Sequence, residues 1–146
     1  MDTTVISHLE QAEKPKEMLA SRVFWEQAKF GFYHLCLSHV TQDEIMACPQ
    51  PRLDQLIVWM SQVIIDVLQA CPEVEALAEA YVDSGRLRRR HLADRRHIAY
   101  ATVYGCDAIV SWNFEHIANE LTRIAVNAVN AKAGYSSIVI CSPDIL

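Results

Sequence analysis

The chain has 146 residues and a mass of 16.5 kDa, a size that fits one domain with a sizeable buried core. Its hydrophobic fraction of 51% and charged fraction of 21% are those of a globular protein and exclude extensive disorder. The net charge of −5 argues against gripping nucleic acid by bulk electrostatics, because neutralising phosphates needs a basic surface. The sequence contains neither a bilayer-spanning apolar run nor a signal-peptide pattern, so we expect a cytoplasmic protein without membrane contact.

The hydrophobic pattern predicts helices that alternate with strands over one domain, residues 1–146. Helices are expected at 15–29, after a cap at Ser38 or Thr41, from Pro51 to Met60, from Pro72 to Gly85, from Asp94 to Gly105 and near 115–132. Strands are expected at 32–37, 63–68, 108–111 and 137–141. This alternation predicts an α/β fold with a mostly parallel sheet and right-handed crossovers.

The five cysteines, at positions 36, 48, 71, 106 and 141, form no C-x-x-C pair. The sequence therefore predicts neither a zinc framework nor a disulfide framework. Cys36, Cys106 and Cys141 lie in or beside apolar runs, where free cysteine behaves as a small hydrophobic residue.

The stretch at 94–119, DRRHIAYATVYGCDAIVSWNFEHIAN, is the most informative part of the chain. Asp94 opens a helix that Gly105 ends, and the apolar run at 108–110 follows as a buried strand. Asn113 comes just after the carboxyl end of that strand, where ligands bind in open α/β sheets. We therefore expect Asp94 and Asn113 to face one crevice.

This stretch resembles the central signature of PIN-domain proteins, metal-dependent ribonucleases that include the VapC-type toxins of bacterial toxin–antitoxin pairs. The similar branch reads D-x-x-H-I-A-x-A, followed by D-x-[IL]-[VL]-[ST]-W-N-[FC]-x-H-I-A-N. DTTVIS at 2–7 resembles the first acidic motif of the family, and SHVTQDEI at 38–45 resembles the second. GYSSIVICSPDIL at 134–146 is similar to the C-terminal strand and tail. The resemblance implies a PIN-like three-layer α/β/α fold with a mostly parallel central sheet.

The resemblance also implies a function, which is metal-dependent hydrolysis of RNA by the toxin of a toxin–antitoxin pair. Asp2, Glu44 and Asp94 would be ligands of Mg²⁺ or Mn²⁺, and Asn113 would assist them as a catalytic residue. The implied partners are an RNA substrate, an antitoxin protein and a second copy in a homodimer. Two other functions stay open: a non-enzymatic PIN-fold interaction protein with a degenerate site that binds no metal, and a small-molecule-binding module that uses the same crevice.

Most of the site residues also have a purely structural interpretation. Glu44 fits a capping box with Thr41, and Asp94 fits a helix N-cap. The amide of Asn113 would ligate a metal weakly, so we expect it to support the ligands from outside. His97 either orients Asp94 or is a buried hydrogen-bonded histidine. His116 and Glu120, at i and i+4, could mimic a metal-binding pair, but we expect a surface pair on one helix.

Six arginines fall within eleven positions around Asp94: Arg86, Arg88, Arg89, Arg90, Arg95 and Arg96. Three of them, Arg89, Arg90 and Arg95, are candidate contacts to the RNA backbone. A solvated turn and helix start explains the same cluster equally well.

PIN domains have an apolar strand before the first aspartate, at the centre of the sheet, whereas only Met1 precedes Asp2 here. We therefore expect the two flanking strands to lack their partner and Asp2 to be the least firmly held acid. The missing strand has three explanations: the native chain is longer, another chain or segment fills the gap, or the gene is a decayed remnant. We favour the first.

Overall fold

A computed structural model provides the fold and describes residues 1–85 and 87–146, so Arg86 of the arginine cluster lies outside the described residues. The elements in chain order are α1 (Thr3–His8), α2 (Pro15–Lys29), β1 (Leu35–Ser38), α3 (His39–Met46), α4 (Arg52–Met60), β2 (Ile65–Leu68), α5 (Pro72–Ala80), the 3₁₀ turn η1 (Tyr81–Ser84), α6 (Leu92–Val103), β3 (Ala108–Val110), α7 (Glu120–Ala133) and β4 (Val139–Cys141). In the described part of the chain, no helix combines the length and apolarity that crossing a membrane requires.

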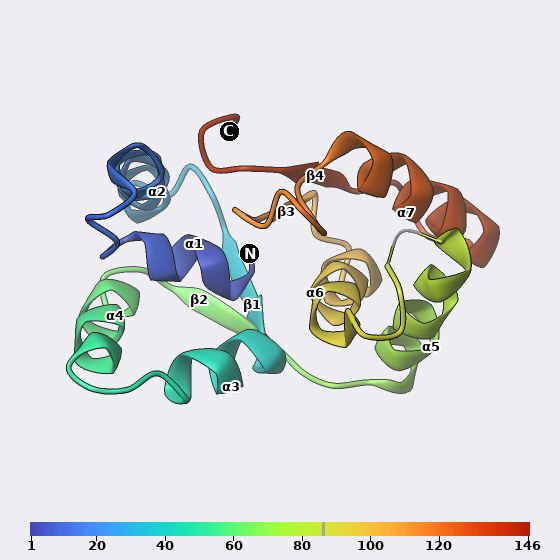
Figure 1. The fold of residues 1–146 in the computed structure, drawn as a ribbon, viewed down its shortest axis with the longest axis horizontal. Helices are drawn as coiled ribbons and strands as arrows, with labels where there is room; N and C mark the ends of the chain where they lie inside the picture. Colours follow the sequence, from blue (N-terminus) through green and yellow to red (C-terminus); the bar gives the residue numbers. More distant parts are fainter. Residues whose placement is uncertain (86) are drawn as a thin grey trace.

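The strands form two separate parallel pairs. β1 pairs with β2, with Cys36 opposite Asp66, and β3 pairs with β4, with Ile109 opposite Ile140. The predicted α/β class with parallel strands is therefore confirmed. As Figure 1 shows, the first pair lies among α1 to α4 and the second pair lies beside α6 and α7.

The start of the chain lies between the two sheets. The backbone nitrogen of Met1 donates to the carbonyl oxygen of Cys36 in β1 at 3.0 Å. The backbone nitrogen of Asp2 donates to the carbonyl oxygen of Val110 in β3 at 3.2 Å. β1 and β3 are not paired with each other among the described residues, and the first two residues of the chain make hydrogen bonds to both strands.

Two hydrophobic clusters cover the strands. One joins α1 to α4 with β1 and also receives Val110 and Cys141, whereas the other joins α5 to α7 with Ile109 and Ile140. Successive side chains of a strand point to opposite faces, so the β3–β4 sheet is buried on both sides. This double burial explains why the 108–110 run lacks polar alternation.

Several helix boundaries follow the capping signals in the sequence. The Ser38 hydroxyl accepts a hydrogen bond from the backbone nitrogen of Thr41, so Ser38, and not Thr41, is the N-cap of α3. Gly105 follows the end of α6 with a φ of 67°, in the left-handed region expected there.

Two predicted helix starts were wrong. α6 begins at Leu92, two residues before Asp94, so Asp94 lies in the first turn and is not the cap. α7 begins only at Glu120, because Asn119 caps it by accepting from the backbone nitrogen of Thr122. His116 therefore lies in the turn before α7 and forms no helical pair with Glu120, which bonds Arg123 instead.

Candidate functional site

Asp2 is the N-cap of α1 and is only 2% exposed. Its Oδ1 accepts from the backbone nitrogen and the hydroxyl of Thr4, at 3.0 and 2.6 Å. Its Oδ2 accepts from the hydroxyl of Ser111 at 2.6 Å. The expectation that Asp2 is the least firmly held acid was therefore wrong, because the capping geometry and two hydroxyls fix its carboxylate.

Glu44 extends from α3 to the start of α1, where it accepts a hydrogen bond from the hydroxyl of Thr3. Nε2 of the buried His97 lies 3.5 Å from the Glu44 carboxylate. The hydrogen bond from His97 lowers the pKa of Glu44, burial opposes this change, and Thr3 adds to the lowering. The capping-box interpretation of Glu44 was wrong, because the cap is Ser38 and the Glu44 carboxylate bonds side chains of other helices.

His97 contacts the second acidic motif and makes no described hydrogen bond to Asp94. Its Nδ1 lies 3.3 Å from the hydroxyl of Thr41, and its Nε2 faces Glu44. Of the two interpretations of His97, the buried hydrogen-bonded histidine is therefore the correct one. Its hydrogen bond favours the ionised form of Glu44.

Asp94 and Asn113 are in direct contact, as their positions in the sequence predicted. Nδ2 of Asn113 donates to Oδ1 of Asp94 at 2.9 Å, and Oδ1 of Asn113 accepts from the backbone nitrogen of His116 at 3.0 Å. Both ends of the amide are thus engaged within the protein. Asn113 orients Asp94, which fits its expected role outside the ligand set.

The surroundings of Asp94 affect its charge. Burial raises the pKa of Asp94, while the nearby His116, His97 and His91 oppose the rise and the charge of Asp2 adds to it. A carboxyl group with a raised pKa holds its proton to a higher pH, and a bound cation would have to displace that proton. Metal affinity at Asp94 should therefore fall as the pH falls.

Two histidines lie beside Asp94: His91 was not identified from the sequence, and His116 was considered only as a partner of Glu120. The rings of His91 and His116 stack with their centroids 4.0 Å apart and their planes 23° from parallel. Together with Asp94 they offer ligand atoms within 4.8 Å of one another. Within the described residues, neither Asp2 nor Glu44 completes a group of this kind. No local sequence motif indicates this pair, because His91 precedes α6 and His116 follows β3 in the chain.

A chain of bonds nevertheless connects the four predicted residues. Glu44 is bonded to Thr3, which follows Asp2, and Asp2 is bonded to Ser111. The Ser111 hydroxyl accepts from the backbone nitrogen of Asn113 at 2.9 Å, and Asn113 bonds Asp94. Residues from four separate parts of the sequence therefore meet around the start of α1.

The oxygen donors of this region suit hard divalent cations. Mg²⁺ commonly uses one or two protein carboxylates and keeps several waters, so acids that do not close around one point can still share a hydrated ion. Asp94 and Glu44 both have carboxylate oxygens without a described hydrogen-bond donor, whereas both oxygens of Asp2 are engaged. Carboxylate oxygens of this kind are suitable ligands for a hydrated Mg²⁺ or Mn²⁺, and the metal-binding atoms that lie close to Asp94 are those of His91 and His116.

The three arginines that were candidate contacts to the RNA backbone all interact with other groups of the protein. Arg95 is 2% exposed, and its guanidinium donates to a backbone carbonyl of α5 at 2.8 Å and to Glu79 at 3.1 Å. It therefore fastens α6 to α5 and is buried away from any RNA backbone. Arg89 is exposed but pairs with Glu79 at 2.7 Å, and Arg90 bonds the neighbouring His91.

Comparisons of the chain with family models, with curated proteins and with solved structures gave no match. The resemblance to PIN domains therefore rests on the motifs quoted above.

Proposed function

We propose that this chain is a PIN-like, metal-dependent ribonuclease that acts as the toxin of a toxin–antitoxin pair. The observation that carries the proposal is the meeting of Asp2, Glu44, Asp94 and Asn113 around the start of α1. A cluster of acids cannot attract a polyanion by itself, so a divalent cation is needed to bring phosphate to it.

The arrangement of helices around the strands supports a PIN-like three-layer α/β/α fold. One hydrophobic cluster joins α1 to α4 to one face of β3 and β4, and the other joins α5 to α7 to the opposite face. The acids follow the carboxyl ends of β1 and β3 in the chain or lie close to them, which is where α/β proteins place their ligands.

Each residue has a distinct role in the proposed reaction. Glu44 and Asp94 hold the cation, while Asp2 fixes the backbone turn that brings Thr3 to Glu44. Asn113 holds Asp94 in place, and the hydrogen bond from His97 lowers the pKa of Glu44. When bound, Mg²⁺ or Mn²⁺ lowers the pKa of a water molecule and neutralises charge on the RNA phosphate.

Cleavage of a fluorogenic RNA in the presence of Mg²⁺ or Mn²⁺ tests this proposal. Asp94→Asn should abolish cleavage without unfolding the chain, because asparagine keeps an acceptor for Asn113. Asp43→Asn is the matched control, since Asp43 is an exposed acid on the same helix as Glu44 and should leave activity unchanged. A folded chain that cleaves no RNA, or cleavage that survives Asp94→Asn, would reject the proposal.

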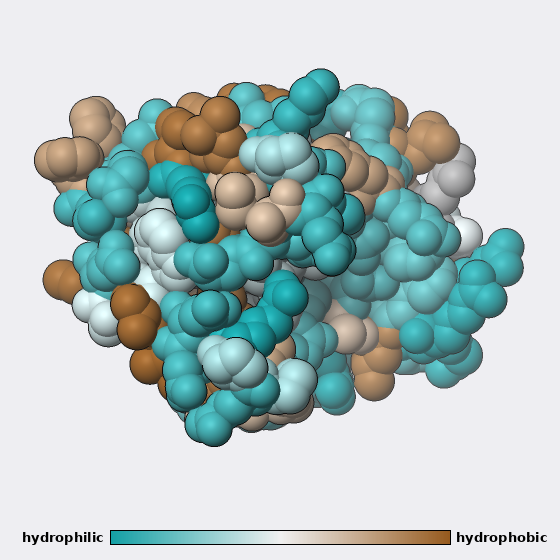
Figure 2. Space-filling model, turned by 60° about the vertical axis from the view of Figure 1, so that its left-hand side comes forward, coloured by the Kyte–Doolittle hydropathy of each residue, from teal (hydrophilic) through white to brown (hydrophobic). Residues whose placement is uncertain are grey.

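A second candidate is a non-enzymatic PIN-fold protein that pairs with itself or with an antitoxin. Exposed apolar side chains favour it: Leu19 and Val23 lie one turn apart on α2 and are 64% and 51% exposed, and Val58 on α4 is 60% exposed. Figure 2 shows hydrophobic side chains interspersed with hydrophilic ones on this side of the molecule. Calorimetry with Mn²⁺ separates the candidates, because a degenerate site should bind no metal.

A further inference from the structure

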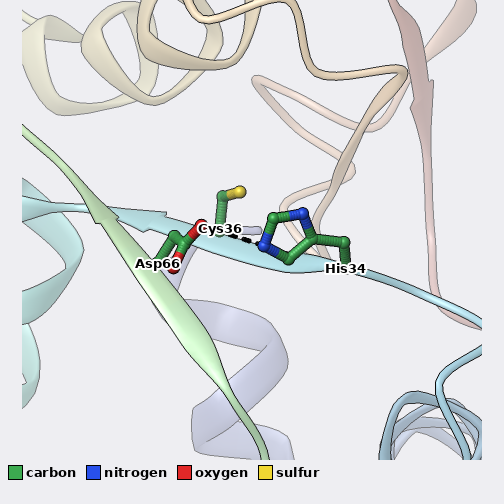
Figure 3. A group of neighbouring side chains, drawn as sticks. All are labelled: His34, Cys36 and Asp66. Atoms are coloured by element: carbon green, nitrogen blue, oxygen red, sulfur yellow. Dashed lines mark hydrogen bonds and ion pairs between the residues drawn. The ribbon is translucent and has the colours of Figure 1, made fainter.

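Three side chains with metal-binding atoms lie together on the β1–β2 sheet, away from the acids described above. His34 immediately precedes β1, and Cys36 lies two residues later, so both side chains lie on the same face of the extended chain. Asp66 of β2 lies directly opposite Cys36 in the parallel register. Figure 3 shows the three side chains side by side, with the imidazole of His34 facing Asp66.

The distances within this group are short. Nε2 of His34 lies 2.9 Å from Oδ2 of Asp66, and the ligand atoms of His34, Cys36 and Asp66 all lie within 4.8 Å of one another. His34 and Asp66 are exposed and Cys36 is half-buried, so an ion could reach them from solvent. Nothing in the chemistry assigned to Asp2, Glu44 and Asp94 uses these residues.

A second thiol, from a distant part of the chain, lies near this group. Cys106 lies in the loop between α6 and β3 and lines the same cavity as Cys36. Burial raises the pKa of the Cys106 thiol, and the neighbouring Cys36 adds to the rise. Both cysteines are free thiols. The thiol of Cys106 can therefore supplement the group formed by His34, Cys36 and Asp66.

These four residues share one cavity. It has a volume of about 660 Å³ and lies between β1 and the loop that leads into β3. Its other lining residues include Phe32, Tyr33 and Tyr104, which supply apolar walls. A pocket with a few converging polar groups on apolar walls is a common setting for a bound ligand.

The geometry points to a site for a thiophilic divalent cation, Zn²⁺, held by Cys36, Cys106, His34 and Asp66. Thiolate and imidazole ligands favour Zn²⁺ over Mg²⁺ or Mn²⁺, so the chemistry differs from that of the proposed nuclease centre. Binding requires both thiols to lose their protons to solvent, which the positive charge of the ion promotes. The imidazole binds in its neutral form through Nε2.

The spacing of His34, Cys36 and Asp66 is close to what a tetrahedral ion needs, whereas Cys106 lies outside this group and would have to move toward it. Zinc lies about 2.0–2.3 Å from its ligand atoms, which places two neighbouring ligands about 3.3–3.8 Å apart. The distance of 2.9 Å between His34 Nε2 and Asp66 Oδ2 would have to increase. Any pair of ligand atoms in this group that is separated by nearly 4.8 Å would have to move closer together. Small side-chain rotations suffice, because two of the ligands lie in solvent.

Cobalt titration of the full chain, kept reduced with a phosphine, tests this site. Co²⁺ should produce a thiolate-to-cobalt charge-transfer band and intense tetrahedral bands, and Zn²⁺ should displace it. Cys36→Ser, Cys106→Ser and His34→Ala should each weaken binding by at least about tenfold. Cys71→Ser and Asp94→Asn should leave the thiolate-to-cobalt charge-transfer band unchanged, which separates this site from the nuclease centre. A titration without a charge-transfer band, or a band unchanged in Cys36→Ser, would overturn the proposal.

A measurement on the wild-type chain avoids any folding defect in the variants. Zn²⁺ should protect Cys36 and Cys106 from alkylation by iodoacetamide, as followed by mass spectrometry of the digested protein. Cys48 and Cys71, which are also half-buried, should react at the same rate with and without Zn²⁺. Equal alkylation of Cys36 with and without Zn²⁺ would contradict the site.

Discussion

Replacing Asp2 by alanine should reveal how firmly the start of the chain is held. The Asp2 carboxylate caps α1 and accepts from the hydroxyls of Thr4 and Ser111 while being only 2% exposed. Alanine removes the cap and leaves two hydroxyl donors without their acceptor.

The expected cost follows from these contacts. Loss of an N-cap costs about 0.5–2 kcal/mol, and a hydrogen bond to a charged group contributes about 1.5–3 kcal/mol. Because the hydroxyls of Thr4 and Ser111 also accept from backbone nitrogens and stay partly satisfied, we expect a net loss of about 2–5 kcal/mol. Asp2→Asn keeps the acceptor for the backbone nitrogen of Thr4 and should cost only about 1 kcal/mol.

Urea denaturation followed by circular dichroism at neutral pH, with a chelator present, measures both variants without any metal contribution. The free energy of unfolding should fall in the order wild type, Asp2→Asn, Asp2→Ala, with an unchanged denaturant slope. An Asp2→Ala chain within about 0.5 kcal/mol of the wild type would refute the assignment of Asp2 as a buried anchor.

Three further predictions test the rest of the structure. Arg95→Ala should lower the free energy of unfolding, measured by urea denaturation, by about 2–4 kcal/mol, because it leaves buried acceptors unpaired. Loss of the exposed ion pair of Arg96 should lower it by less than about 1 kcal/mol. Tyr81→Phe should lower the stability by about 1–3 kcal/mol in thermal melts, since the buried hydroxyl donates to Asn130 at 2.7 Å. Because the pKa of Glu44 is lowered in the folded chain, Glu44 should stabilise the fold at pH values above its unfolded pKa of about 4.3. This stabilisation should be lost as the pH falls through the folded pKa. Glu44→Gln should remove it from a plot of unfolding free energy against pH.

Local signals in the sequence were sufficient for many elements. Pro15 and Pro72 begin α2 and α5, and Ser38 caps α3, because each satisfies or avoids unpaired backbone groups within a few residues. The contact between Asp94 and Asn113 was also predictable, since a helix followed by a short turn and a parallel strand brings its start close to the end of the strand.

Contacts between distant residues could not be read in this way. The burial of Arg95 depends on carbonyl groups that α5 presents after packing, and the stacking of His91 on His116 depends on how two turns meet. Cys36 and Cys106 likewise line one cavity although they are far apart in the sequence. Asp2 was misjudged for the same reason, because its second partner, Ser111, lies at the other end of the sequence.

The most direct test of the central claim is a Mn²⁺ titration of the full chain, followed by calorimetry and by the electron paramagnetic resonance signal of the free ion. The claim is that Glu44 and Asp94 share one divalent cation. It predicts one Mn²⁺ bound per chain, with the affinity reduced by about tenfold or more in both Glu44→Gln and Asp94→Asn and unchanged in Asp43→Asn. Binding of Mn²⁺ that is the same in the wild type and in both variants, or no binding to the folded wild type, would contradict the claim.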